Sequence, residues 1–440
     1  MNLANVYTDG RTAEEVLAPK EPQGESAPSS VDKKTVDKKN GVVGGLSTIE
    51  KWIDQWIRLP EIGLRFDPFR EQFAEEDSRL PLYLVDHGAF SVLWGDWISA
   101  VFAPAGGGKT AFRVRLLHAC RTREDGRRIF PIPVVDILPS DNALARVTRG
   151  AARELLLHLL FSPSTFLSLS QEDRQEVGSL LRASLLADFD FLVERLEDLV
   201  GGIQATAGWN RLTDLFDPAA AELFSPPSPK KVQRFLEQLK HAAAGEPPSD
   251  PTTRFERFKR LLFGPLKYET VYVVIDGVDA HTQDAGQMKE VLKPFIELAD
   301  GWKRERIFAK FFLPLELRNY MVKSSHLLTT DRQFAIIKWS KEELQELIRF
   351  RLQAAAEEPR AFASLDALCT PALRRTEEAV LEAVRPNPRD VLRIVETLFA
   401  THVRRAGAPS GRLEPEDLDE AIRLYREQSQ KSRQLPLMLF

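Results

Sequence analysis

The spacing of hydrophobic residues changes several times along this 440-residue chain, and each spacing predicts a different kind of element. A continuous apolar run at 271–275 predicts a strand that is buried on both faces, and the largely apolar runs at 98–102 and 307–315 predict two more strands. Shorter or interrupted apolar runs predict three further strands, at 82–85, at 132–138 and at 333–338. Strands of this kind need helices on both faces of their sheet, so the pattern predicts an α/β fold.

Most of the other apolar residues recur at helical spacing. A first amphipathic helix is predicted from about Thr48, and its apolar face consists of Ile49, Trp52, Ile53, Trp56 and Ile57. The stretch from about 161 to 265 is helix-rich and longer than a simple connection between strands, so we interpret it as a helical insertion. From Ser340 onward the pattern is helical, with further helix starts at Asn387 and Glu414.

These elements divide the chain into four parts. Residues 1–46 are poor in large apolar side chains and are predicted to be a disordered tail, either solvated or contacting a partner. Residues 47–339 are predicted to form the sheet domain, which contains the insertion at 161–265. Residues 340–430 are predicted to form a C-terminal helical domain, followed by a tail at 431–440.

Composition narrows the class of protein without identifying it. The chain is 43% apolar and 28% charged, with a formal net charge of −4, which gives no argument for nucleic acid or an anionic membrane as a partner. Two distant cysteines, Cys120 and Cys369, exclude a disulfide framework. No apolar run approaches the ~18 residues that span a bilayer, and no signal peptide is recognisable at the N-terminus. We therefore predict a cytoplasmic protein with no membrane partner.

One glycine-rich stretch indicates nucleotide binding. It reads Ala-Pro-Ala-Gly-Gly-Gly-Lys-Thr and lies between the apolar run at 98–102 and a helical pattern, the context that a P-loop requires. Glycines let backbone N–H groups approach phosphates, Lys109 would reach the β- and γ-phosphates, and Thr110 would ligate Mg²⁺. The alternative is a glycine-rich turn without a ligand. The predicted nucleotide-binding residues are Ala103, Pro104, Ala105, Gly106, Gly107, Gly108, Lys109, Thr110 and Ala111.

A second stretch supplies candidate carboxylates. The apolar run at 271–275 ends at Asp276, at the strand end where open α/β sheets bind ligands. Asp276 could hold the magnesium ion together with Thr110, and Asp279 could orient or deprotonate the attacking water. Taken alone, Asp276 could also be a strand-ending turn residue.

Other site residues are predicted less sharply. Arg318, after the run at 307–315, could neutralise charge on the γ-phosphate, with Glu316 and Asn319 as alternatives. Arg318 could equally be a surface arginine on a turn. The nucleotide base could pack on Phe66, Phe69 or Phe73, although ordinary core packing is at least as good an interpretation of each.

With both motifs placed, the chain resembles bacterial STAND NTPases related to NACHT domains, in the AAA+-related branch of P-loop NTPases. The resemblance is carried by Gly-Gly-Gly-Lys-Thr-Ala-Phe-Arg at 106–113 and by Ile-Asp-Gly-Val-Asp at 275–279, and it spans roughly 64–425. It implies a parallel sheet of about five strands, with one strand between those that carry the two motifs. It also implies ATP between the sheet and a C-terminal helical lid or winged-helix-like domain.

The resemblance further implies that Arg389 contacts phosphate from the lid. Arg389 could instead be a helix-start residue that pairs with Asp390 or with solvent. Ala103 replaces the first glycine of the loop motif, which should be tolerable. Ala280 replaces the last acid of the second motif, so hydrolysis rests on Asp279 and could be slow. No guanine-reading Asn-Lys-x-Asp motif is evident, so ATP is favoured over GTP.

Three functions remain open at this point. The leading hypothesis is an Mg-dependent ATPase that acts as a nucleotide-dependent switch with unknown protein partners or as a homo-oligomer. The second is an AAA+-type ATPase that acts on nucleic acid, for which the sequence offers scattered basic residues: Arg374, Arg375, Arg393, Arg404 and Arg405. The third is a nucleotide-binding scaffold with little turnover.

Overall fold

The computed structural model describes residues 48–135, 137–138, 140, 142–202, 228–243, 250–323, 326–358 and 362–434. The tail predicted at 1–46 lies outside the described residues, and so do residues 435–440. The last helix, α17 (Pro415–Gln434), includes the first residues of the tail predicted at 431–440.

The centre of the molecule is a five-stranded, all-parallel sheet with the order β2-β3-β4-β1-β5. The strands are β1 (Ser99–Ala103), β2 (Ile129–Val134), β3 (Thr270–Ile275), β4 (Ile307–Pro314) and β5 (Phe334–Ile336). This confirms the predicted α/β class and the parallel sheet of about five strands. The strand β4 lies between β1 and β3, so one strand does separate the two motif-bearing strands.

Two strand predictions need correction. No strand forms at 82–85; Leu80–Leu82 is a short 3₁₀ helix instead, and Leu80 and the following Tyr83 pack on Val114. A spacing of three suits such a turn, and Pro81 provides no N–H for a ladder. The strand predicted at 132–138 lies earlier, at Ile129–Val134. It contains two prolines because β2 is an edge strand, where a missing N–H costs least.

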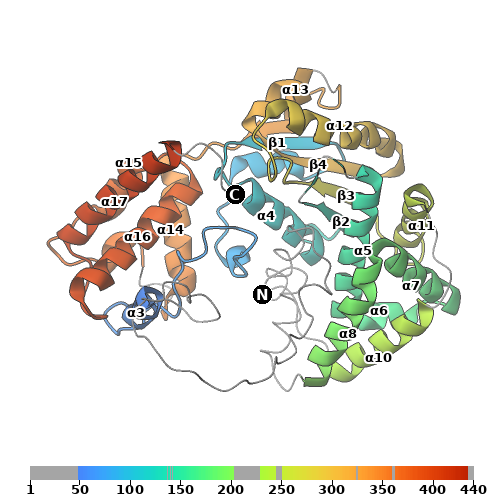
Figure 1. Ribbon diagram of the computed structural model, residues 1–440, viewed down its shortest axis with the longest axis horizontal. Coiled ribbons are helices and arrows are strands. Elements are labelled where there is room, and N and C mark those ends of the chain that lie inside the picture. The colour runs from blue at the N-terminus through green and yellow to red at the C-terminus, as the bar shows by residue number, and fades with distance from the viewer. Residues whose placement is uncertain are drawn as a thin grey trace, which may run out of the picture.

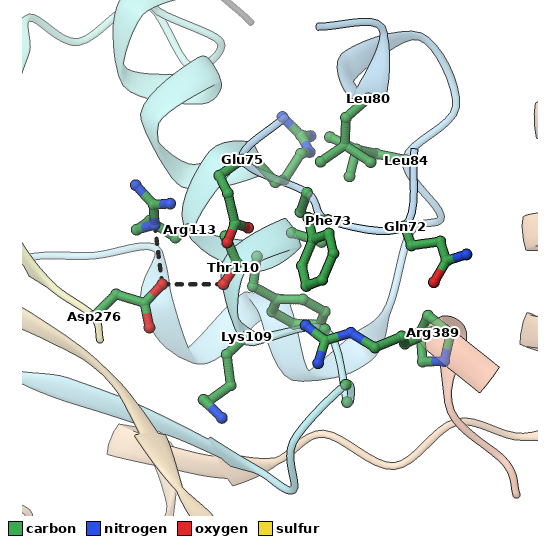
Figure 2. Close-up of a pocket in the computed structure, with 18 of the residues that line it drawn as sticks. Gln72, Phe73, Glu75, Leu80, Leu84, Lys109, Thr110, Arg113, Asp276 and Arg389 are labelled. Carbon is green, nitrogen blue, oxygen red and sulfur yellow. Dashed lines mark hydrogen bonds and ion pairs between the residues drawn. The ribbon is translucent and has the colours of Figure 1, made fainter. Parts of the chain in front are cut away.

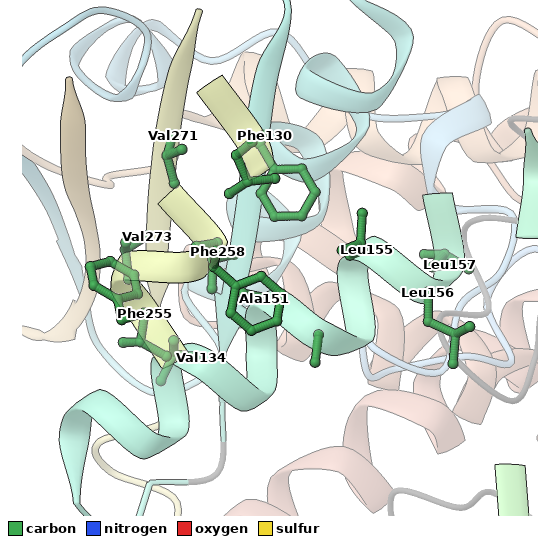
Figure 3. Packing of buried hydrophobic residues seen from close by; sticks show 14 of the residues in the cluster. Phe130, Val134, Ala151, Leu155, Leu156, Leu157, Phe255, Phe258, Val271 and Val273 are labelled. Carbon is green, nitrogen blue, oxygen red and sulfur yellow. The ribbon is translucent and has the colours of Figure 1, made fainter. Parts of the chain in front are cut away.

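Helices cover both faces of the sheet because alternate strand residues point to opposite faces. On one face, β-strand residues such as Phe130, Val271 and Val273 pack with helices α5 (Ala143–Phe161) and α11 (Pro251–Phe263), as Figure 3 shows. On the other face, Val101 and Tyr272 pack with α4 (Lys109–Thr122). The first face also carries α12 (Ala285–Trp302), and the short helix α13 (Arg318–Lys323) follows β4.

The described parts of the stretch 161–265 are helical and extend the core of the first face. They comprise α6 (Pro163–Ser168), α7 (Gln171–Leu185), α8 (Ala187–Gly202), α10 (Pro229–Ala242) and α11. In Figure 1 these helices lie together beside α5, on the side of the sheet away from the C-terminal helices.

A second hydrophobic core lies among the C-terminal helices α14 (Lys341–Ala355), α15 (Thr376–Ala383), α16 (Pro388–Ala406) and α17. It also contains α3 (Thr48–Ile57), although the predicted boundary at residue 47 groups α3 with the sheet. Trp56 of α3 is fully buried, with its ring 5.0 Å from that of Phe399 and 4.9 Å from that of His402. Figure 1 shows α3 beside the C-terminal helices and apart from the sheet. We call the two parts the sheet half and the helical half.

Within the described residues, no helix is long and apolar enough to cross a membrane.

Candidate functional site

The glycine-rich loop joins β1 to α4, and its backbone leaves little room for side chains. Gly106 and Gly108 have positive φ values of 76° and 95°, which side-chain-bearing residues rarely adopt. A Cβ on Gly107 would lie 2.9 Å from the Ala103 methyl group and 3.0 Å from the Pro104 carbonyl oxygen. Ala103 itself is the last residue of β1 and is fully buried. All three glycines are therefore required by the shape of the loop.

The loop forms one wall of a cavity of about 500 Å³, a size suited to a small organic ligand. Its other walls come from widely separated parts of the chain, as Figure 2 shows. The segment before β1 contributes Gln72, Phe73, Glu75, Leu80 and Leu84, the end of β3 contributes Asp276 and Asp279, and the helical half contributes Arg389. The predicted residues from Pro104 to Ala111 all line the cavity.

Lys109 and Asp279 form an ion pair in this cavity. The Lys109 Nζ lies 3.2 Å from Asp279 Oδ2 and 3.5 Å from the Ala103 carbonyl oxygen. The lysine side chain is buried, whereas the Asp279 side chain is about a quarter exposed, at 24%. The structure therefore brings together the predicted phosphate-binding lysine and the predicted base.

Asp276 is buried at the end of β3, and hydrogen-bond donors contact both of its carboxylate oxygens. Oδ2 accepts from Thr110 Oγ1 at 3.3 Å and from Arg113 Nε at 3.0 Å, and Oδ1 accepts from the Gly277 N–H at 2.8 Å. Burial raises the pKa of this carboxyl group, the neighbouring Asp279 raises it further, and the charges of Arg113 and Lys109 oppose that rise. The two predicted metal ligands, Thr110 and Asp276, are therefore adjacent.

Arg389 reaches the glycine-rich loop from the first turn of α16. Its Cβ lies 3.1 Å from the position that a Cβ on Gly106 would occupy. Its guanidinium carbon lies 4.9 Å from the centre of the Phe73 ring, and its buried Nε has no hydrogen-bond partner among the described residues. Asp390, the alternative partner considered for Arg389, accepts hydrogen bonds from Arg385 and Asn387.

The three phenylalanines proposed for base packing differ in their burial and in their position relative to the cavity. Phe69 is fully buried in the core of the helical half, and Phe66 packs at the edge of that core with the Arg79 guanidinium over its ring. Phe73 is 42% exposed and lines the cavity. Of these three phenylalanines, only Phe73 lines the cavity.

Arg318 is not brought to the cavity. It begins α13, and its guanidinium carbon lies 5.7 Å from the centre of the Phe334 ring. Neither Arg318 nor its alternatives Glu316 and Asn319, all of which are described, line the cavity.

Among the cavity residues that the sequence did not predict as site residues, Arg113 and Trp339 make direct contacts with predicted ones. Arg113 follows Thr110 by three positions on α4, and that spacing could have indicated a shared helix face. Trp339 lies between β5 and α14, and its Nε1 donates to the Gly107 carbonyl oxygen at 3.0 Å. No local pattern marks Trp339, because its contact depends on the position of the loop 232 residues earlier.

The residues present fit a nucleotide with a magnesium ion. A cradle in which a Cβ would clash, a buried lysine, and Arg389, whose Nε has no partner among the described residues, all line one cavity. In the described part of the chain, no group of three or more histidine, cysteine or acidic side chains is arranged so that it could hold a metal ion by itself. Magnesium in phosphate sites needs no such cluster, because phosphate oxygens and water supply most of its ligands.

The basic residues considered for nucleic acid are partly committed to internal pairs. Arg405 contacts Asp417 and Glu414, and Arg375 lies 3.9 Å from Glu378. These pairs give no specific support to a nucleic-acid surface.

No protein-family model, curated protein or solved structure matches this chain.

Proposed function

We propose that the chain binds ATP with Mg²⁺ in the cavity between its two halves and that occupancy sets how the halves are arranged. In this proposal it is a STAND-like P-loop ATPase with the helical half as its lid. The observation that carries the proposal is that two cationic side chains, Lys109 from the sheet half and Arg389 from the helical half, line the same glycine-walled cavity.

Each residue then has a role that follows from its contacts. Lys109 binds the terminal phosphates, and Thr110 and Asp276 hold the magnesium ion. Arg389 contacts the phosphates from the opposite wall, and the exposed face of Phe73 supports the base. Bound magnesium supplies positive charge at the β- and γ-phosphates.

Asp279 has a conditional role. It is paired with Lys109 in the structure, so it becomes available to orient a water molecule only when Lys109 turns to phosphate. Since Ala280 supplies no second acid beside it, we propose that hydrolysis is slow and that ATP serves mainly as a switch signal.

Switching follows from a difference in contacts between states. A ligand shifts a conformational equilibrium only by binding one arrangement better than another. ATP held by both halves favours the arrangement in which Arg389 reaches the phosphates. Protein partners or further copies of the chain would then bind preferentially to that arrangement.

Binding is tested by Lys109→Met. Loss of the buried ammonium group should weaken Mg-ATP binding by at least about tenfold, measured by isothermal titration calorimetry. Lys240→Met is the matched control, because Lys240 on α10 pairs with Glu197 on α8 and does not line the cavity. Equal affinity in wild type and Lys109→Met would contradict the proposal.

The switch is tested by light scattering after size exclusion, combined with solution X-ray scattering, with and without Mg-ATP. We expect a nucleotide-dependent change of mass or radius that Arg389→Ala abolishes. ATP binding without any such change would contradict the switch proposal and favour a nucleotide-binding scaffold.

A further inference from the structure

The ion pair between Arg113 and Asp276 lies inside the wall of the cavity. The Arg113 side chain is 14% exposed and the Asp276 side chain 7%. Figure 2 shows Arg113 and Thr110 directed at the same carboxylate oxygen, Oδ2 of Asp276. The oxygen that faces the predicted magnesium ligand Thr110 is therefore already occupied by a guanidinium group.

Helix geometry explains why these groups meet. Thr110 and Arg113 are three positions apart on α4, so their side chains lie on one face of the helix. Any cation held between Thr110 and Asp276 would lie close to the Arg113 guanidinium. The structure thus places a permanent cation beside the proposed metal position.

The charges around this position are balanced without a ligand. Arg113 pairs with Asp276, and Lys109 pairs with Asp279. A divalent cation added alone would face both basic groups at short range, where repulsion is strong because the site is largely buried. A cation that arrives with phosphate oxygens brings compensating negative charge.

We propose that Arg113 is a placeholder cation that occupies Asp276 in the metal-free protein and competes directly with a divalent metal ion for this carboxylate. Arg113 is then a positioning residue, which keeps the carboxylate aligned and makes the metal bind tightly only together with the nucleotide. This inference rests on the proposed nucleotide site.

The test is Mn²⁺ binding without nucleotide, followed by electron paramagnetic resonance of the free ion. The pH is kept well above the usual carboxyl range so that protons do not compete. Arg113→Met should bind Mn²⁺ about tenfold more tightly than wild type. The gain should disappear in Arg113→Met/Asp276→Asn. Arg257→Met, which breaks the pair of Arg257 with Glu176 away from the cavity, should bind as wild type does.

Equal Mn²⁺ binding by folded wild type and Arg113→Met would overturn the proposal, and so would a gain that survives in the double variant. If Arg113→Met does not fold, Arg113→Lys serves instead. Lysine keeps the charge but loses the Nε donor, so a smaller gain is expected, and equal binding counts against the proposal.

A separate measurement of ATP affinity in EDTA isolates the underlying function. If wild type binds no ATP either in EDTA or with Mg²⁺, the nucleotide proposal fails, whereas the Mn²⁺ comparison still decides whether Arg113 competes with metal.

Discussion

The sheet half and the helical half each supply one wall of the cavity, and they are built differently. In the sheet half, the candidate site residues lie at strand ends, in the loop after β1 and at the end of β3. The helical half combines α3 with helices that follow β5. Its core therefore joins a segment that precedes all strands of the sheet in the sequence to segments that follow all of them. The wall from the sheet half is formed by residues that directly follow strands in the sequence. The wall from the helical half depends on packing between segments that are far apart in the sequence.

Two buried ionisable residues, Lys310 in the sheet half and Asp417 in the helical half, have different surroundings. In the sheet half, the fully buried Lys310 donates to the carbonyl oxygens of Gly95 and Trp97, both at 2.7 Å. Burial lowers the pKa of its ammonium group to about 7. In the helical half, burial opposes ionisation of Asp417, but hydrogen bonds from His402 and Arg405 outweigh it and lower its pKa to about 2.

Asp417 therefore has charged partners, whereas the polar partners of Lys310 are carbonyl oxygens. The connection between β5 and α14, whose Trp339 packs at the edge of both cores, makes polar contacts with the sheet half: Trp339 Nε1 bonds to the Gly107 carbonyl oxygen, and the Lys338 carbonyl oxygen bonds to His87 Nε2. We therefore expect changes in the loop to abolish binding and changes at the contact between halves to adjust it.

Gly107→Val tests the sheet wall and has the largest expected effect. Its Cβ would lie 2.9 Å from the Ala103 methyl group, so the loop must move. Displacing the loop should weaken Mg-ATP binding on the order of a hundredfold, measured by calorimetry. Gly301→Val is the control, since a Cβ at Gly301 meets no atom within 4 Å. Comparable losses in both variants would mean that loop shape does not decide binding.

Lys310→Met tests the buried charge of the sheet half. Between about pH 7 and 10.5, the unfolded chain binds a proton at Lys310 that the folded protein does not. The free energy of unfolding should therefore rise with pH through this window, by an amount on the order of a few kcal/mol. Lys310→Met should flatten this rise in urea unfolding at several pH values, whereas Lys240→Met should not. An unchanged slope in Lys310→Met would show that Lys310 is not the titrating group.

Trp339→Phe tests the contact between the halves and has the smallest expected effect. Phenylalanine keeps a ring but removes the Nε1 donor to Gly107, which should cost about 1 kcal/mol in unfolding free energy and change ATP affinity a few-fold. Trp94→Phe is matched to it, because the Trp94 Nε1 bonds to Asp125 away from the loop. If Trp339→Phe and Trp94→Phe bind ATP with the same affinity, the hydrogen bond from Trp339 to Gly107 does not affect ATP binding by the loop.

The sequence alone determined the elements whose cause is local. Buried strands show as apolar runs, and a strand followed by glycines, lysine and threonine predicts a helix start that cradles anions. For this reason Lys109, Thr110, Asp276 and Asp279 were predicted and do lie together. The prediction of a strand at 82–85 was wrong because a short apolar run does not distinguish a strand from a turn of 3₁₀ helix.

Only the tertiary structure decided which distant residues complete the cavity. Phe73, Arg389 and Trp339 reach it because the core of the helical half packs beside the loop, whereas Arg318 turns away onto Phe334. Likewise, α3 packs on α16 through Trp56, although its own pattern shows only an apolar face and not what covers it. Local periodicity specifies that a face must be buried, but the partner is selected by the complementarity of whole surfaces in the folded chain.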